Sequence, residues 1–346
     1  MPSINPFTAL LHESRSHRRM FKRVDPITLE LNIDNSTLEK LLTCPRSFEF
    51  YLVFGRDTGH RDALNYGTAI HLALEHYFKS GHDSTELNQI LCDHFDANPP
   101  SENSWRNLDH AIESIRRYVS LREQMQKWNP IEYQGKKAVE ICFSLPLFQW
   151  TNPDAHLPYP SSLIVDSCDE EEFTRCHFIN VNYTGKIDLA VECNSGGDPR
   201  NYDIIDHKTT SIGGPTFWKQ FYLSAQMRGY TWAATQLFDH APCHTIIDCI
   251  VGRGPSLKGK GVMHEIEQQS YTYSQDSINE WRDNVTDHIR VMLNRLSRGF
   301  FPEANTHCVN KFGMCDYHDV CTQPMNSRQL ILASGQYADR TWSPVP

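Results

Sequence analysis

The chain has 346 residues, and its 33 Lys and Arg against 42 Asp and Glu give a formal net charge of −9. Hydrophobic residues make up 39% of the sequence, which is enough for a sizeable core and excludes a globally disordered or collagen-like chain. No run approaches the roughly 18 apolar residues of a membrane span. No apolar stretch follows the early basic residues, so we expect no secretory signal, no membrane partner and a cytoplasmic location.

The first part of the chain predicts mostly helix. Residues 1–34 show only weak periodicity and are predicted to form a leader. The segment Ser36-Thr-Leu-Glu39 has the form of a capping box, in which the Ser and Glu side chains satisfy free amides of a first helical turn. Two amphipathic helices are then predicted, over 67–78 and 104–128, because apolar residues repeat there at helical spacing.

The pattern changes to strand-like alternation at residues 137–148. Residues 150–178 are predicted to be a surface insertion. Two further strands are predicted over 181–193 and 201–210. The residues between them, Asn-Ser-Gly-Gly-Asp-Pro-Arg, are typical of a turn.

Alternation of helix and strand continues towards the end of the chain. A helix is predicted around 215–238, a strand over 244–251 and a long amphipathic helix over about 275–298, with Gly299 as its stop. The order of these elements predicts an α/β protein.

The hairpin of the two central strands places chemistry-bearing residues together. If its turn centres on Gly197, paired residue numbers sum to 394, so Asp188 lies opposite Asp206 with Cβ atoms about 5 Å apart. Two like charges there are destabilising unless a cation lies between them. Lys208 follows Asp206 by two residues and therefore projects from the same face of its strand.

Hard carboxylate oxygens suit Mg²⁺ or Mn²⁺, which polarise a phosphodiester and lower the pKa of a bound water. On spacing alone, a surface hairpin with a cross-strand salt bridge remains an alternative. His71, on the helix over 67–78, is a candidate third ligand or a structural histidine. Gln226 and Tyr230 lie at i and i+4 on one helix face, where they orient Lys208 or a nucleotide, or merely pack.

Four of the 11 cysteines stand apart from the rest. They are Cys44, Cys308, Cys315 and Cys321. The last three have the spacing C-x6-C-x5-C, and four thiolates suit either an iron–sulfur cluster or a structural zinc ion. A mixed site that includes His307 or His318 is a further alternative, as are four unrelated buried thiols.

Four motifs occur in a characteristic order. They are GTAIH (67–71), GKID (185–188), DHKT (206–209) and QMRGY (226–230). The set resembles the PD-(D/E)XK nuclease superfamily, in its RecB-like branch of helicase-associated nucleases, CRISPR adaptation nucleases and phage exonucleases. The resemblance spans about residues 36 to 322. The Pro-Asp of the family name is replaced by Ile187-Asp188, as is common in this branch, and the insertion is longer than the family leads us to expect.

The resemblance implies a role for each matching residue. His71, Asp188, Asp206 and the backbone carbonyl of His207 would hold Mg²⁺ or Mn²⁺. Lys208 would be catalytic, with Gln226 and Tyr230 positioning the lysine or the substrate. Glu140, at the start of the strand series, is a further candidate acid. The catalytic set is therefore Lys208, Asp188, Asp206, Gln226 and Tyr230.

The implied fold is a central mixed β-sheet flanked by α-helices, a restriction-endonuclease-like core with an N-terminal helical segment and a Cys-rich C-terminal tail. We expect a leader over 1–34, a nuclease domain over 35–325 with its insertion at about 150–178, and a tail over 326–346. Many members of the branch carry one Cys before the core and three after it. This layout implies a structural [4Fe–4S] cluster on Cys44, Cys308, Cys315 and Cys321, with zinc as the lesser alternative.

The implied function is a metal-dependent DNA nuclease, an exonuclease acting on single-stranded DNA ends in recombination, repair or phage replication. Its partners would be DNA and recombination or replication proteins. One alternative is a CRISPR adaptation nuclease. Two others are a non-catalytic DNA-binding module with a structural metal and a zinc-stapled structural protein.

Overall fold

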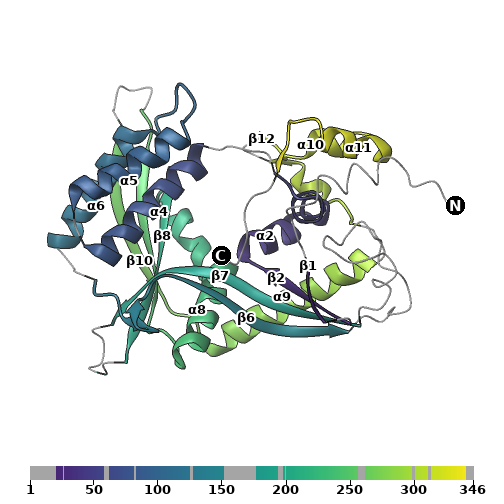
Figure 1. The fold of residues 1–346 in the computed structure, drawn as a ribbon, viewed down its shortest axis with the longest axis horizontal. Coiled ribbons are helices and arrows are strands. Elements are labelled where there is room, and N and C mark those ends of the chain that lie inside the picture. The colour runs from purple at the N-terminus through teal and green to yellow at the C-terminus, as the bar shows by residue number, and fades with distance from the viewer. Residues whose placement is uncertain are drawn as a thin grey trace. The chain divides into compact units, whose positions relative to one another are not determined.

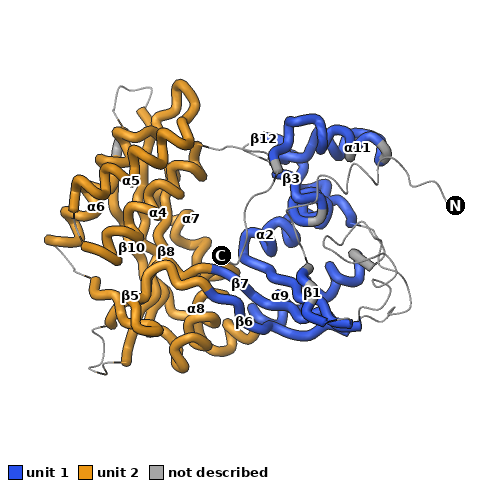
Figure 2. The backbone as a smooth tube through the Cα atoms, viewed as in Figure 1, with its two compact units in different colours: residues 1–59, 143–185, 280–346 blue, residues 60–142, 186–279 orange. Residues whose placement is uncertain are grey.

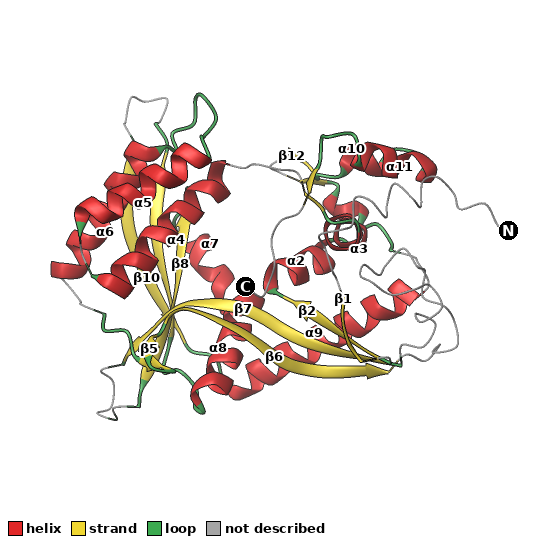
Figure 3. Ribbon diagram, in the orientation of Figure 1, coloured by secondary structure: helices red, strands yellow, loops and turns green. Residues whose placement is uncertain are grey.

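The computed structural model describes residues 21–25, 27–57, 62–81, 83–124, 128–151, 177–193, 198, 200–255, 262–297, 301–310 and 313–339. Within them the predicted fold class is confirmed, because a mixed β-sheet is flanked by α-helices (Figures 1 and 3). None of the described helices is long and apolar enough to cross a membrane.

Seven strands of the described residues form the main sheet, in the order β1-β2-β7-β8-β9-β10, with β6 also paired to β7. Their bounds are β1 Phe21–Asp25, β2 Thr28–Ile33, β6 Val139–Thr151, β7 Phe178–Glu192, β8 Tyr202–Thr210, β9 Thr245–Arg253 and β10 Met263–Tyr271. The pairs β2–β7 and β8–β9 are parallel, and β1–β2, β7–β8 and β9–β10 are antiparallel. The sheet is therefore mixed.

Three pairs of two-residue strands lie outside this sheet. They are β3 Arg56–Asp57 with β13 Ala338–Asp339, β4 Glu132–Tyr133 with β5 Lys136–Lys137, and β11 Val309–Asn310 with β12 Gly313–Met314. The chain divides into two compact units, residues 1–59, 143–185 and 280–346 forming unit 1, and residues 60–142 and 186–279 forming unit 2 (Figure 2).

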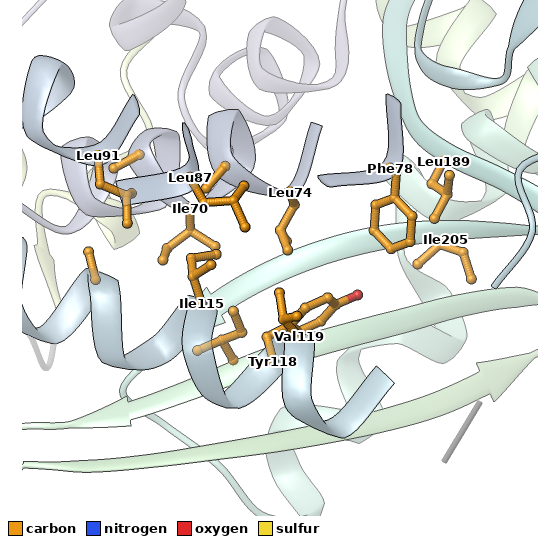
Figure 4. Close-up of a cluster of buried hydrophobic side chains, with 14 of the residues drawn as sticks. Ile70, Leu74, Phe78, Leu87, Leu91, Ile115, Tyr118, Val119, Leu189 and Ile205 are labelled. Carbon is orange, nitrogen blue, oxygen red and sulfur yellow. The ribbon is translucent and has the colours of Figure 1, made fainter. Parts of the chain in front are cut away.

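Unit 2 packs three helices on one face of its strands. They are α4 Asp62–Ser80, α5 Ser84–Ala97 and α6 Leu108–Gln124. The predicted apolar face of α4 is buried in this layer, with Ile70, Leu74 and Phe78 each no more than 6% exposed. Leu189 of β7 and Ile205 of β8 meet this layer from the sheet (Figure 4).

The single helix predicted around residues 215–238 is wrong in detail. This part of unit 2 consists of three helical pieces, which pack on a second apolar cluster. The segment forms α7 Pro215–Lys219, a 3-10 turn over Gln220–Leu223, and α8 Ala225–Phe238. Ser224 breaks the run because its extended backbone and its side chain, which accepts from the amide of Met227, make it the N-cap of α8. Met227 then packs with Ile247 and Tyr271.

Unit 1 holds the remaining helices. They are α2 Asn35–Thr43, α3 Pro45–Phe48, a π-helical turn over Glu49–Val53, most of α9 Gln275–Ser297, a 3-10 turn over Asn305–His307, α10 His318–Cys321 and α11 Met325–Leu332. The apolar face predicted for the long helix is buried, and the Trp281 ring lies 5.1 Å from that of Tyr183 on β7.

The last residues of the leader predicted over 1–34 belong to the main sheet in the structure, where they form β1 and β2. Leu29, Leu31 and Ile33 alternate inward from β2, and β2 pairs with β7. A parallel partner about 150 residues later in the chain gives no local signal, so short-range periodicity missed this strand. The predicted capping box is also wrong, because the cap of α2 is Asp34, whose carboxylate accepts from the amide of Thr37 at 2.9 Å.

Two elements of unit 2, α5 and β10, were not predicted from the sequence. Most of the predicted insertion (152–176), Gly197 and Gly299 lie outside the described residues. The domain limits at 35 and 325 stay a prediction.

Candidate active site

The hairpin of β7 and β8 has the predicted register. Leu189 pairs with Ile205, and Glu192 with Tyr202, so paired numbers sum to 394. Asp188 and Asp206 lie one position beyond the last pair of this ladder, Leu189 with Ile205. There the backbone N–H of His207 donates to the Asp188 carboxylate at 2.8 Å. A side chain thus takes a hydrogen bond that the ladder no longer supplies.

The two acids are both buried, Asp188 being 7% and Asp206 3% exposed. Burial and, next, the charge of Asp206 raise the pKa of Asp188 to about 6. Neighbouring carboxylates in a buried site disfavour each other's ionised form. A cation bound here would favour the ionised form of Asp188.

His71 on α4 and Glu140 on β6 complete a cluster of possible metal ligands around Asp188. One ligand atom from each of the three residues lies within 4.8 Å of the others. The Nδ1 atom of His71 is 3.5 Å from the Asp188 carboxylate. Burial, and then the nearby His207, lower the pKa of His71 to about 4, so its imidazole is neutral and able to coordinate a metal at neutral pH.

Glu140 enters this cluster through an unusual backbone conformation. Its φ of +56° lies in the left-handed region, which costs a non-glycine residue about 1–3 kcal/mol. Its carboxylate pairs with Lys186, and burial together with the charge of Asp188 raises its pKa. The strand pattern around Glu140 gave only a weak reason to place it here, because the left-handed turn of the backbone leaves no mark in the alternation.

Lys208 is held at the site from two sides. Its ammonium lies 2.9 Å from the Asp206 carboxylate and donates to the amide oxygen of Gln226 at 3.0 Å. Gln226 in turn donates to the hydroxyl of Tyr230 at 3.2 Å. Burial opposes the charge of Lys208, but the charge of Asp206 and its hydrogen bond raise the pKa of the ammonium. The structure thus joins the predicted trio in one hydrogen-bonded chain.

The side chain of His207 points to the face of β8 opposite that of Asp206 and Lys208, and the sequence predicts no role for it. Its ring stacks on Phe78 at 5.7 Å, and its Nδ1 atom lies 3.2 Å from the Asp248 carboxylate. Asp248 is also paired with Arg122 of α6. Burial opposes protonation, but the hydrogen bond with Asp248 raises the pKa of His207. This buried network anchors the peptide group that contacts Asp188, and sequence spacing could not reveal it because Arg122 and Asp248 are 126 residues apart.

The four predicted cysteines lie in unit 1 and interact with one another. Cys44 separates α2 from α3, and the N–H of Cys315 donates to the carbonyl of Cys308 at 2.8 Å. Burial raises the pKa of Cys321 to about 11, with smaller contributions from the thiols of Cys315 and Cys44. Although all four are described, no three of their sulfurs lie within 4.8 Å of one another.

A mixed α/β fold with clustered acids, a neutral histidine and a positioned lysine is typical of metal-dependent hydrolases that act on phosphodiesters. The model of the PD-(D/E)XK nuclease superfamily matches residues 35–322. The chain therefore belongs to this superfamily of nucleases.

Solved structures give a weaker likeness. A crystal structure from Eubacterium rectale, provisionally described as an exonuclease, aligns with 12% identity and a TM-score of 0.44 over 95% of this chain and 98% of that chain. At these values it carries no argument about substrate or site. No functionally curated protein matches the chain.

Proposed function

We propose that the protein is a metal-dependent DNA exonuclease that acts on single-stranded ends. The observation that carries this proposal is the meeting of His71, Glu140 and Asp188, with the charge of Asp206 acting on Asp188 and a lysine held between Asp206 and Gln226. A structural salt bridge between Lys208 and Asp206 would need neither the buried Asp188 beside it nor the left-handed backbone of Glu140.

The residues present fit a hard divalent cation. We assign Asp188, Asp206 and His71 as its ligands, together with the backbone carbonyl of His207, and add Glu140 to them. The amide of His207 already faces Asp188, and in a strand the N–H and C=O of one residue point to the same edge. A bound Mg²⁺ or Mn²⁺ supplies polarisation of the scissile phosphate and a bound water of lowered pKa.

Lys208 orients the attacking water and offsets charge that develops on the phosphate. Its charged state is secured by Asp206, and its position by Gln226 and Tyr230. An ammonium held from two sides before the substrate arrives loses little conformational freedom during reaction, which is the basis of electrostatic preorganisation.

A single-stranded substrate is supported by exposed side chains close to Gln226 in the sequence. Tyr222 and Leu223, in the 3-10 turn before α8, are 59% and 76% exposed. Unstacked bases pack on such aromatic and apolar surfaces, whereas paired bases do not offer their faces. DNA ends, recombination or replication partners and a role in repair are the expectations that the family resemblance adds.

We further propose that Cys44, Cys308, Cys315 and Cys321 bind a structural [4Fe–4S] cluster. A tetrahedral zinc ion with Zn–S bonds of about 2.3 Å would draw its sulfurs to about 3.8 Å from one another. No three of the four sulfurs lie within 4.8 Å of one another. A cluster of four irons and four sulfides is a larger body that holds its thiolates further apart, which favours the cluster over a zinc ion.

The nuclease proposal is tested by digestion of end-labelled single- and double-stranded DNA with Mg²⁺ or Mn²⁺, comparing wild type with Lys208→Ala. Lys79→Ala is the matched control, because Lys79 is also a lysine of unit 2 whose ammonium pairs with an acid, Glu75. We expect Lys208→Ala to lose at least a hundredfold in rate, as for removal of one charge-stabilising donor. The Lys79→Ala rate should stay within twofold of wild type.

The substrate pattern decides between the alternatives. Progressive shortening from labelled single-stranded ends supports exonuclease action, whereas cleavage of circular DNA would indicate an endonuclease. If wild type, Lys208→Ala and Lys79→Ala are equally inactive with every metal and strand form, the chain is a binding module and the catalytic proposal is wrong.

A further inference from the structure

A second cluster of metal-binding side chains lies in unit 2, away from the acids. Cys193 directly follows β7, Asp203 lies in β8, and Cys243 lies just before β9. One ligand atom from each of the three residues lies within 4.8 Å of the others. None of these residues belongs to the motifs of the nuclease site.

Backbone hydrogen bonds fix the three residues around the start of β8. The N–H of Cys193 donates to the carbonyl of Asn201 at 2.9 Å, and the N–H of Cys243 donates to the carbonyl of Tyr202 at 2.8 Å. Adjacent carbonyls of a strand point to opposite edges, so the two cysteine backbones flank β8. The ligand atoms therefore converge over one strand from both of its neighbours.

The side chains of Asp203 and Asp206 point to opposite faces of the sheet. Side chains alternate along a strand, and Asp206 is three positions after Asp203. Asp203 also faces the layer of Ile205, which packs against α4 to α6. An ion held at Asp203 would thus be distinct from one held at Asp188 and Asp206.

The carboxylate of Asp203 is held in place by His244, which directly precedes β9. Both the backbone N–H and the Nδ1 atom of His244 lie 2.9 Å from its Oδ1 atom. Second-sphere bonds of this kind orient a metal ligand and reduce the entropy lost on binding. The arrangement leaves Oδ2 as the oxygen to face the two sulfurs.

The three groups are of the types that bind a thiophilic cation. Two thiols and one carboxylate offer ligand atoms within 4.8 Å of one another, and burial together with the Cys193 thiol raises the pKa of Cys243 to about 11. Without a metal the thiols stay protonated, and a bound metal would displace one proton from each.

A disulfide does not fit this geometry. Both cysteines are free in the structure. β8 lies between their backbones, and two strands on either side of a third are about 9–10 Å apart. A disulfide requires Cα atoms within about 7 Å. The pair is therefore arranged to share a ligand rather than a covalent bond.

We propose that Cys193, Asp203 and Cys243 form a binding site for a thiophilic divalent cation of the zinc class. Soft thiolates favour such ions over Mg²⁺, and three protein ligands leave a fourth, open position for water. The ion ties the end of β7 to β8 and to the segment entering β9, three residues before Asp206. It stabilises the hairpin on which the two acids are placed.

The test uses Co²⁺ as a spectroscopic probe for zinc, added to reduced, anaerobically purified full-length protein. A thiolate-to-cobalt charge-transfer band reports sulfur ligands only, so metal bound at Asp188 and Asp206 does not contribute. We expect wild type to bind one equivalent that Cys193→Ser and Cys243→Ser both lack. Cys92→Ser, a partly exposed thiol on α5, is the matched control and should keep it.

Two further measurements separate this site from the others. A large excess of Mg²⁺ should not displace the band, and Lys208→Ala should keep it whether or not the protein is a nuclease. Zinc should raise the Tm of wild type by more than that of Cys243→Ala, which keeps the acids of the nuclease site and, at a partly exposed position, is expected to fold normally. The proposal is overturned if Cys243→Ser retains the full band, or if Cys321→Ser alone removes it.

Discussion

At the scale of single residues, burial moves the two kinds of metal ligand in opposite directions. It raises the pKa of the Asp188 carboxyl and lowers that of the His71 imidazole, since each shift favours the neutral form. The imidazole is thereby ready for a metal, whereas the carboxyl is costly to ionise until the metal arrives. Without a metal, the buried Asp188 carboxyl lowers the stability of the folded protein, a cost that function requires at this site.

Replacing Asp188 by Asn should therefore stabilise the metal-free protein at pH 7.5 while abolishing nuclease activity. Below about pH 4 the carboxyl is protonated in both the folded and the unfolded chain, and the substitution should be nearly neutral. Between about pH 4 and 6 only the unfolded chain ionises, so wild type loses stability as the pH rises.

Above pH 6 the advantage of Asp188→Asn should level off at about 1–3 kcal/mol, from a shift of about two pKa units at 1.36 kcal/mol each. Denaturant unfolding in the presence of a chelator, at pH 4, 5, 6 and 7.5, measures this profile. An advantage that is constant over the whole range, or largest at pH 4, would contradict it.

At the scale of secondary-structure elements, a single side chain caps the start of a helix. Sequence patterns do not determine which of several residues this is. The segment from Asp34 to Glu39 contains two possible caps for α2, and only the structure shows that Asp34 is the one that accepts from Thr37. Ser36 instead lies exposed within the first turn. The same residue types serve either role, so the backbone conformation of Asp34 decides.

Asp34→Ala should lower the free energy of unfolding by about 1 kcal/mol, the usual cost of removing an N-cap. Ser36→Ala should change it by less than about 0.5 kcal/mol, as for other exposed positions. Urea unfolding followed by circular dichroism measures both. An equal or larger loss in Ser36→Ala would mean that the capping box forms in solution.

At the scale of the whole molecule, the four cysteines of unit 1 come from distant parts of the sequence. Cys44 and Cys321 are separated by 321 − 44 = 277 residues. Linking them through a shared cluster removes much of the conformational freedom of the unfolded chain, and this entropic effect grows with the logarithm of loop length. The cluster would therefore contribute to stability rather than to phosphodiester chemistry.

Cys315→Ser should lose the iron and acid-labile sulfide of anaerobically purified wild type, which we expect at about four of each per chain. It should also unfold at a lower temperature, whereas Cys92→Ser should match wild type in metal content and Tm. Zinc in place of iron in the wild-type protein would show that the cluster assignment is wrong.

The local part of the site could be predicted from the sequence. The alternation of β7 and β8 and the turn between them determine the register that brings Asp188 beside Asp206. The two-residue step to Lys208 and the four-residue step from Gln226 to Tyr230 follow from the periods of strand and helix. Such short-range relations are properties of one element or one hairpin, and the residues themselves carry them.

Only the tertiary structure decided the rest, because it depends on contacts between residues far apart in the chain. The pairing of β2 with β7, the left-handed backbone that turns Glu140 to the metal ligands, and the Arg122–Asp248–His207 network have no local signature. The meeting of Cys193, Asp203 and Cys243 likewise requires three strands to be in place. Periodicity determines which face a side chain occupies, whereas the packing of distant segments determines what that side chain meets.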